Sequence, residues 1–228
     1  MTPGELVKAV AEVLGMPEMN VIYYDRKLVE AGLRSKHGRG RGAAHVTSRD
    51  AAHLLTSILG SMQVKDAVAT VRRYSATRPE GGTAAQKRYA ELGLAELAAL
   101  PSDHSLVDAL EALIIATVSG SLHQRRPETG WARSSTPTVA PDVEVWALAP
   151  GTVAEIRISG LKPEMIAIVR YGRPTPWDGG RKPSKAQLDA WEKEAKETGL
   201  LGDLETQRRI TTRTLVHVAQ ALSASVEN

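Results

Sequence analysis

Apolar residues recur at helical spacing through the first half of the chain. Thr2 and Glu5 have the spacing of a capping box, and Leu6, Val10 and Leu14 then fall four positions apart, as one buried helix face requires. Similar stripes, each bounded by a capping residue, a glycine or a proline, predict five more helices. We expect helices over residues 2–14, 17–31, 47–60, 64–74, 84–100 and 106–118.

The pattern changes between the second and third of these helices. Residues 33–36 and 43–46 are predicted to be short strands, joined by the glycine-rich turn Gly38–Gly42. Thr47 follows as an N-cap, with Asp50 in the reciprocal capping position. The order helix, helix, hairpin, helix predicts an N-terminal winged helix-turn-helix.

Polar and apolar residues alternate with period two in the last third of the chain. Val143–Leu148 and Val153–Ile158 alternate around Pro150 and Gly151, which predicts a hairpin with one buried face. We expect a third strand over residues 165–171, a charged surface helix over 184–198 and an amphipathic terminal helix over 204–222.

The predicted fold class is therefore mainly α with an α+β C-terminal part. Residues 124–141 are rich in Arg, Ser, Thr and Pro and have no apolar period, which is typical of a linker or a long exposed loop. We expect a winged helix-turn-helix DNA-binding domain over 1–61, a helical packing or oligomerisation region over 62–123, the linker over 124–141, and over 142–228 an α+β domain with a small sheet and terminal helices.

Composition excludes several classes of protein. Hydrophobic residues make up 42% and charged residues 24% of the 228, which is ordinary for a globular protein. No apolar run approaches the ~18 residues of a membrane span, and the N-terminus lacks the apolar region of a signal peptide. There is no cysteine, so disulfides, zinc ribbons and thiol nucleophiles are excluded. We expect a cytoplasmic protein that is not attached to a membrane.

Motifs for catalysis or cofactor binding are missing from the sequence. The six histidines show no tight ligand pair. No phosphate-binding P-loop and no Gly-x-Ser-x-Gly elbow occurs. We therefore expect no metal site, no cofactor and no enzymatic activity.

Positive charge is concentrated near the predicted wing. Between residues 22 and 49 there are seven Lys or Arg and two acidic residues, which creates an attractive local field for phosphates. DNA reading by this architecture needs a helix with a polar outer face and a basic appendage that reaches neighbouring phosphates. The candidate DNA-binding residues are Asn20, Tyr23, Arg26, Lys27, Arg34, Lys36, His37, Arg39, Arg41 and Arg49.

The segment Val21–Arg26, followed by Gly32–Arg34 and a basic hairpin, resembles the MerR-type winged helix-turn-helix. The resemblance implies that Tyr23, Arg26 and Tyr24 approach the DNA backbone. Adjacent helical residues point about 100° apart, so we expect Tyr24 in the core. Ile22 stands where the family has its first arginine, and the resemblance therefore supports the superclass better than the family.

A second similarity is to proteins of phage or mobile-element type. It is carried by Ala31–Leu33, Gly38–Gly42 and Thr47–Ala52. This similarity implies that the protein comes from a phage or mobile element, but it gives no indication of an activity.

The leading functional hypothesis is a transcriptional regulator that binds double-stranded DNA. A homodimer would place two reading helices about one turn of DNA apart and would favour an inverted-repeat operator. The C-terminal part would then provide dimerisation, or bind a protein or small-molecule effector.

Alternatives stay open at this point. The chain also fits a phage-type DNA-packaging protein, such as an oligomeric small terminase subunit. Trp146, Trp177 and Trp191 are candidates for a small-molecule pocket or for ordinary core packing. A second basic stretch is either another nucleic-acid surface or a solvated loop, and it contains Arg170, Arg173, Arg181, Lys182 and Lys185.

Overall fold

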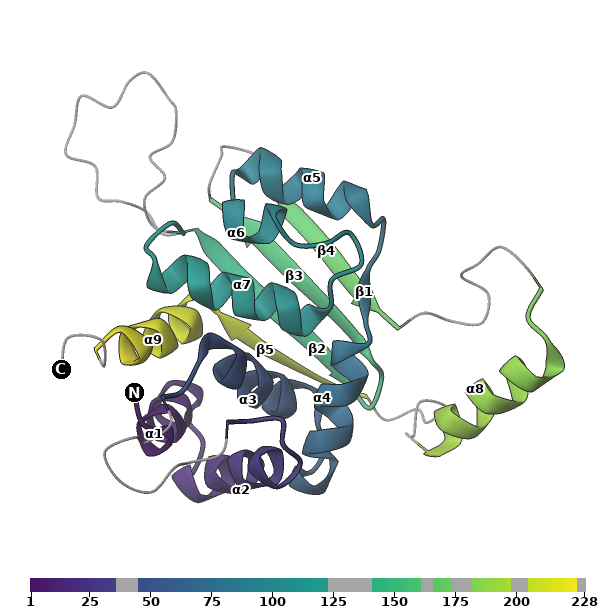
Figure 1. Ribbon diagram of the computed structural model, residues 1–228, viewed down its shortest axis with the longest axis horizontal. Coiled ribbons are helices and arrows are strands. Elements are labelled where there is room, and N and C mark those ends of the chain that lie inside the picture. The colour runs from purple at the N-terminus through teal and green to yellow at the C-terminus, as the bar shows by residue number, and fades with distance from the viewer. Residues whose placement is uncertain (36–44, 123–140, 161–165, 174–181, 198–204, 225–228) are drawn as a thin grey trace.

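The computed structural model describes residues 1–35, 45–122, 141–160, 166–173, 182–197 and 205–224. It is mainly α-helical, with one antiparallel sheet built largely from the C-terminal third (Figure 1). The helices are α1 (Pro3–Leu14), α2 (Glu18–Glu30), α3 (Ser48–Gly60), α4 (Ala67–Ser75), α5 (Thr83–Leu92), α6 (Ala95–Ala98), α7 (Leu106–Val118), α8 (Lys185–Glu197) and α9 (Thr212–Ser223), with a 3-10 turn, η1 (Val64–Asp66). The strands are β1 (Arg78–Pro79), β2 (Asp142–Ala149), β3 (Val153–Ser159), β4 (Ala167–Gly172) and β5 (Thr206–Thr211).

Reciprocal capping boxes start three of the long helices. Thr2 caps α1 with Glu5, and Thr47 caps α3 with Asp50, which confirms both sequence predictions. Asp108 plays the same part in α7. In each box the two side chains satisfy backbone N–H groups that have no partner within the helix.

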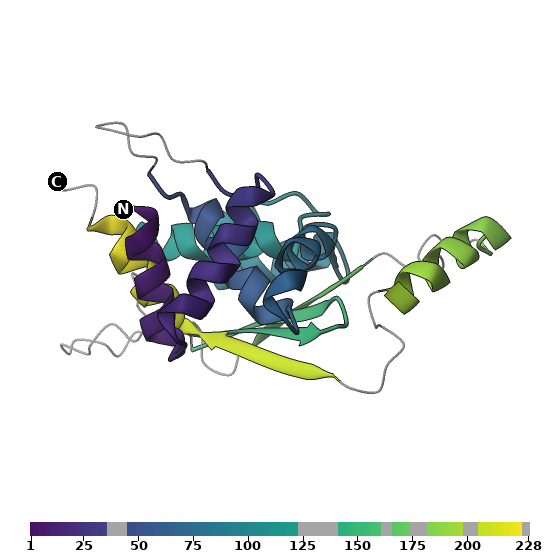
Figure 2. The ribbon, with the colours of Figure 1, turned by 90° about the horizontal axis from the view of Figure 1, so that it is seen from below.

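The sheet has the strand order β1-β4-β3-β2-β5, and every neighbouring pair is antiparallel. The alternation predicted for β2 and β3 is confirmed, because Val145 and Ile156 pair and both are fully buried. Figure 2 shows α3, α4 and α7 on one side of the sheet. The inward side chains of the strands therefore meet the helices in an apolar layer.

One hydrophobic core joins segments that are far apart in the sequence. It includes Leu6 of α1, Leu55 of α3, Ile156 of β3 and Leu215 of α9. Helix α9 packs on both α1 and α7, and the two ends of the described chain consequently lie on the same side of the molecule (Figure 1). Segments assigned by pattern to the N-terminal, middle and C-terminal parts thus share buried contacts.

One prediction about the sheet is wrong. Residues 206–211, the start of the predicted terminal helix, form strand β5, because Thr206 to Thr211 pair with β2 in a register that buries Ile210. Strand β1, which contains Arg78 and Pro79, was not predicted. Proline is compatible with this position because β1 is an edge strand. The predicted helix over 84–100 is also divided, at Gly93, whose φ of 66° ends α5.

Tyr74 ties the helical layer to the sheet. Its hydroxyl donates to the carbonyl oxygen of Leu148 at 2.7 Å. Its ring fills the space beside Gly60, where an added Cβ would lie 2.2 Å from a ring carbon. Only glycine allows α4 to approach α3 this closely.

A buried chain of three side chains connects β4 with α5 and the start of α7. The Nδ1–H of His104 donates to Pro101 O at 2.6 Å, which leaves Nε2 to accept from the Tyr171 hydroxyl at 2.8 Å. Tyr171 in turn accepts from the Tyr89 hydroxyl at 2.9 Å. All three side chains are almost fully buried. Burial lowers the pKa of His104, and the hydrogen bond to Pro101 opposes this only in part.

We predict that mild acid destabilises the protein. The unfolded chain binds a proton at His104 more readily than the folded chain does, so the free energy of unfolding falls as the pH drops below about 6.5. His53, whose pKa is also lowered, mainly by burial, acts in the same direction. Each histidine contributes a slope of up to about 1.4 kcal/mol per pH unit. Urea unfolding at pH 7.5 and 5.5 measures the loss.

The variant His104→Gln is expected to lose less stability between these pH values than the unmodified protein. His217→Gln, at a half-exposed position, is the control. An unchanged pH dependence in His104→Gln contradicts the assignment.

Candidate nucleic-acid interface

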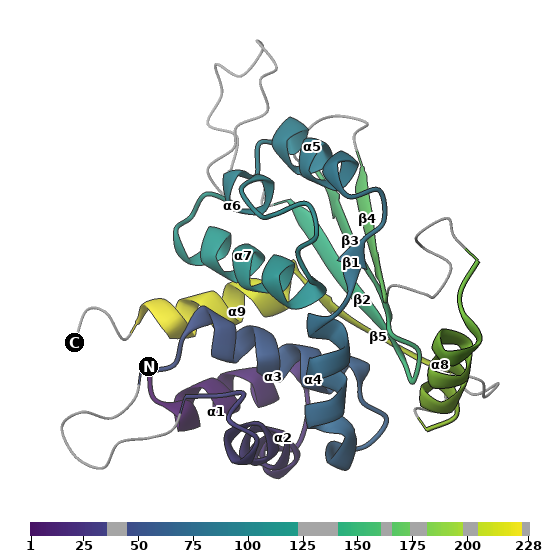
Figure 3. The ribbon, with the colours of Figure 1, turned by 45° about the vertical axis from the view of Figure 1, so that its right-hand side comes forward.

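Helix α2 lies at an edge of the molecule, beside α1 and α4 (Figure 3). Its inner side chains, Val21, Tyr24 and Leu28, are buried. The prediction that Tyr24 belongs to the core is therefore confirmed. The outer side chains recur every three or four residues on one stripe, as helical geometry requires. The exposed residues of the stripe are Met19, Asn20, Tyr23, Arg26, Lys27 and Glu30.

Four of these exposed residues are among the predicted DNA contacts. We call this set, Asn20, Tyr23, Arg26 and Lys27, the α2 face. Tyr23 is 45% exposed. Lys27 pairs with Glu30 at 2.9 Å, but both side chains are about half exposed. Such a surface pair contributes little stability. Among the described residues Arg26 has no ion-pair partner. Two cationic side chains are thus available to a ligand.

Arg34 is a buried anchor of the wing root. It is 3% exposed, and its Nη1 donates to both carboxylate oxygens of Asp25. A buried guanidinium needs such an acid, because an unpaired charge in the interior is strongly destabilising. The contact ties α2 to the chain that leaves it. Arg34 was predicted as a DNA contact, and in the structure it has this structural role.

The carboxylate of Asp50 binds both ends of the segment between α2 and α3. Ser35 donates to it through its N–H at 3.1 Å and its hydroxyl at 3.3 Å. Thr47 donates through its N–H and its hydroxyl, each at 2.9 Å. We call this arrangement the Asp50 clasp. It sets the distance between residues 35 and 47, which form the root of the predicted wing.

The pKa of Asp50 reflects the clasp. Burial, the largest single effect, would raise it, but the hydrogen bonds from Thr47 and Ser35 and the charge of Arg34 together bring it below its ordinary value. The side chain consequently stays ionised and accepts hydrogen bonds with its full charge.

The predicted strand 33–36 is wrong for its described residues. Leu33, Arg34 and Ser35 form no strand. The Leu33 carbonyl oxygen accepts from the Nδ1–H of His53 at 2.5 Å, and the Ser35 N–H donates to Asp50. The side chains of His53 and Asp50 thus form hydrogen bonds with the carbonyl and N–H groups that would otherwise pair with a neighbouring strand. His45 and Val46 are likewise not in a strand, and the Val46 N–H donates to Met1 O at 3.1 Å.

Arg49 joins α3 to α7. Its guanidinium donates to Asp108 at 2.6 Å and to Glu111 at 2.9 Å. Burial would raise the pKa of Asp108, but hydrogen bonds from Arg49 and Ser105 bring it below its ordinary value. Arg49 is thus paired with two acids and joins two helices, and its predicted contact with DNA stays a prediction.

The ten predicted residues therefore divide into three groups. Arg34 and Arg49 hold the fold through acids, and the four residues of the α2 face lie together on one exposed stripe. The remaining four lie outside the described residues, and these are Lys36, His37, Arg39 and Arg41. Sequence reasoning missed Asp25, and it recognised Asp50 only as a capping residue. The available signal was that arginines outnumber acidic residues near residue 34. An arginine that becomes buried there would need one of the few nearby acids as its partner.

We predict that Asp50→Asn opens the clasp. An amide offers one acceptor oxygen in place of the two charged oxygens of a carboxylate. The free energy of unfolding should therefore fall by about 1–3 kcal/mol at neutral pH. The amides of Ser35 and Thr47 should also exchange with deuterium faster. The lowered pKa of Asp50 stabilises the fold at pH values above the pKa that this group has in the unfolded chain, and protonation in acid removes this stabilisation. The difference in stability between variant and parent should therefore shrink below pH ~4.

Asp66→Asn provides a matched control, since Asp66 caps η1 in the same way but lies far from the wing root in the sequence. Ser35 and Thr47 amides that exchange equally fast in the parent and in Asp50→Asn would contradict the clasp.

The described residues hold no candidate metal centre. No three of their His, Asp or Glu side chains gather in a way that could hold a metal ion. Within the same residues, no helix combines the length and apolar character that a membrane span requires. Comparison with protein-family models, curated proteins and solved structures finds no match to this chain.

Proposed function

We propose that the protein is a cytoplasmic, sequence-specific DNA-binding transcriptional regulator. Helix α2 would enter the major groove through the α2 face, and the segment that leaves the Asp50 clasp would contact neighbouring phosphates or the minor groove. The observation that supports this most is the exposed α2 face on a helix whose Asp25 holds Arg34, the residue before the anchored Ser35.

The side chains of the α2 face suit a duplex. An α-helix with its side chains is about 10–12 Å wide, and the major groove is about 12 Å wide. Asn20 and Arg26 carry groups that pair with adenine and guanine edges, and the Tyr23 hydroxyl suits a phosphate oxygen. The exposed Lys27–Glu30 pair is weak enough to exchange for a phosphate contact.

Regulators of this type act as symmetric dimers, and we propose the same arrangement here. Two copies related by a twofold axis would present two α2 faces about one helical turn of DNA apart. The preferred site would then be an inverted repeat. A ring of many subunits, measured by mass on the DNA-bound sample, would favour the packaging alternative.

We predict that replacing Arg39 and Arg41 together with Ala weakens binding to all duplexes. Loss of two phosphate contacts should lower the slope of log K against log salt by up to about one per residue. Fluorescence anisotropy with a labelled duplex at several salt concentrations measures both effects. Arg213→Ala, an exposed arginine on α9, is the control, and an unchanged salt slope in the double variant would remove the segment from the interface.

Arg26→Ala is predicted to change which sequences are bound. A base contact carries about 1–3 kcal/mol of discrimination, so selection from random duplexes should show relaxed preference at one position in each half-site. Selected sites that are identical for the parent and the variant would exclude Arg26 from base reading.

A further inference from the structure

The sheet has a second face, opposite the helices that form the core (Figure 2). The outward side chains of β5, β2, β3 and β4 lie in rows across the strands. In the central row Arg209 pairs with Trp146, Trp146 with Glu155, and Glu155 with Arg170. We call the outward residues Trp146, Leu148, Val153, Glu155, Arg157, Arg170, Gln207 and Arg209 the sheet face; the alternation of the strands places Asp142, Glu144, Ser159 and Ile168 on the same side.

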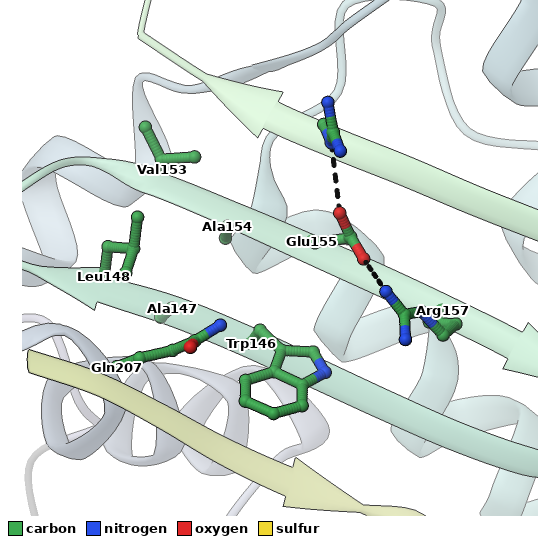
Figure 4. A pocket seen from close by; sticks show the side chains of 9 residues that line it. Trp146, Ala147, Leu148, Val153, Ala154, Glu155, Arg157 and Gln207 are labelled. Atoms are coloured by element: carbon green, nitrogen blue, oxygen red, sulfur yellow. Dashed lines mark hydrogen bonds and ion pairs between the residues drawn. The ribbon is translucent and has the colours of Figure 1, made fainter.

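A shallow hollow of about 460 Å³ lies on this face (Figure 4). Its floor is the strand backbone at Ala147 and Ala154, which pair across β2 and β3. Leu148 and Val153 provide an apolar side, and Val153 is 44% exposed. The hollow thus combines an apolar surface with charged groups from the next row.

Arginines line the charged side of the hollow. Glu155 accepts from Arg157 at 2.9 Å and from Arg170 at 3.1 Å, so two guanidinium groups face one carboxylate. The two arginine side chains are 44% and 62% exposed. Glu155 itself is 18% exposed, but ion pairs whose cation is open to solvent contribute little stability. An incoming anion can therefore share both guanidinium groups with Glu155.

The aromatic group of the face is held by a third arginine. The guanidinium of Arg209 lies 5.0 Å from the centre of the Trp146 ring and donates to Glu144 at 2.6 Å. The indole Nε1–H of Trp146 donates to the same carboxylate at 3.1 Å. The ring is thus fixed in place beside the hollow. Asp142 is the further acid on this side of β2, at the far end of the strand.

We propose that the sheet face binds a single strand of DNA or RNA. Unstacked bases would pack on Trp146 and on the apolar side of the hollow, and phosphates would meet Arg157 and Arg170. Four strands spaced ~4.8 Å apart give a surface about 14 Å wide, enough for two or three nucleotides. A duplex hides its base faces in its own stack, so it cannot use the tryptophan. This inference does not depend on the α2 face.

The test is anisotropy of labelled dT12 and U12 with the full-length protein. Trp146→Ala and Arg170→Ala should each weaken binding about fivefold or more, because a stacked base or a phosphate contact is lost. Glu155→Gln should tighten binding several-fold, since it removes a negative charge and releases two guanidinium groups. A gain of affinity cannot arise from misfolding. Arg72→Ala, an exposed arginine on α4, should bind like the parent.

The comparison of dT12 with U12 identifies the kind of strand, and binding of either supports the proposal. No binding of either, unchanged affinity in Trp146→Ala, or no gain in Glu155→Gln would overturn it. A poly-glutamate peptide that competes as well as the oligonucleotide would also overturn it and assign the face to an acidic protein segment. Arg26→Ala should retain single-strand binding while it alters duplex binding, so the two proposals can fail separately.

Discussion

The carboxylate of Asp50 is the group on which the N-terminal architecture depends. Nine residues, three of them glycine and two arginine, separate residues 35 and 45 in the sequence. Asp50 joins the chain on the two sides of this segment by accepting from Ser35 and Thr47 at once. The same side chain caps α3. One ionised group therefore starts a helix and shapes the root of the segment beside it.

Charge pairing extends from this point through the helical layer. Asp25 neutralises Arg34 below the wing root, and Asp108 with Glu111 neutralises Arg49. Asp108 also caps α7, so the two capping carboxylates of α3 and α7 both serve tertiary contacts. These acids neutralise the arginines that lie inside or between helices. The exposed cations of α2, Arg26 and Lys27, are not held by them.

The two surfaces proposed for nucleic acid come from one folded core. Strand β5 leads directly into α9, and α9 packs on α1, which supports α2. The α2 face is a convex helix that suits a groove, whereas the sheet face is a broad surface with an aromatic ring and arginines that suits an unpaired strand. We propose them for different forms of nucleic acid because of these shapes.

Local patterns were sufficient for most of the elements. Apolar residues at helical spacing and capping pairs such as Thr47 with Asp50 located α1, α2, α3 and α7, and alternation located β2 and β3. These signals are readable because each depends on neighbours within a few residues. The exposed α2 face followed from the same periodicity, since the residues opposite a buried stripe must face outward.

Only the tertiary structure decided the rest. Residues 206–211 form a strand because they pair with the edge of β2 in a register that buries Ile210. Strand β2 lies far earlier in the sequence, so the local pattern of residues 206–211 does not indicate this pairing. Arg34 and Arg49 look like Arg26 in the sequence, and their roles differ because Asp25, Asp108 and Glu111 reach the first two in space. The sequence by itself determined which residues are cationic and where helices begin. Which cations stay free was decided by the fold, because a buried or half-buried charge is stable only with an acid that the chain brings to it.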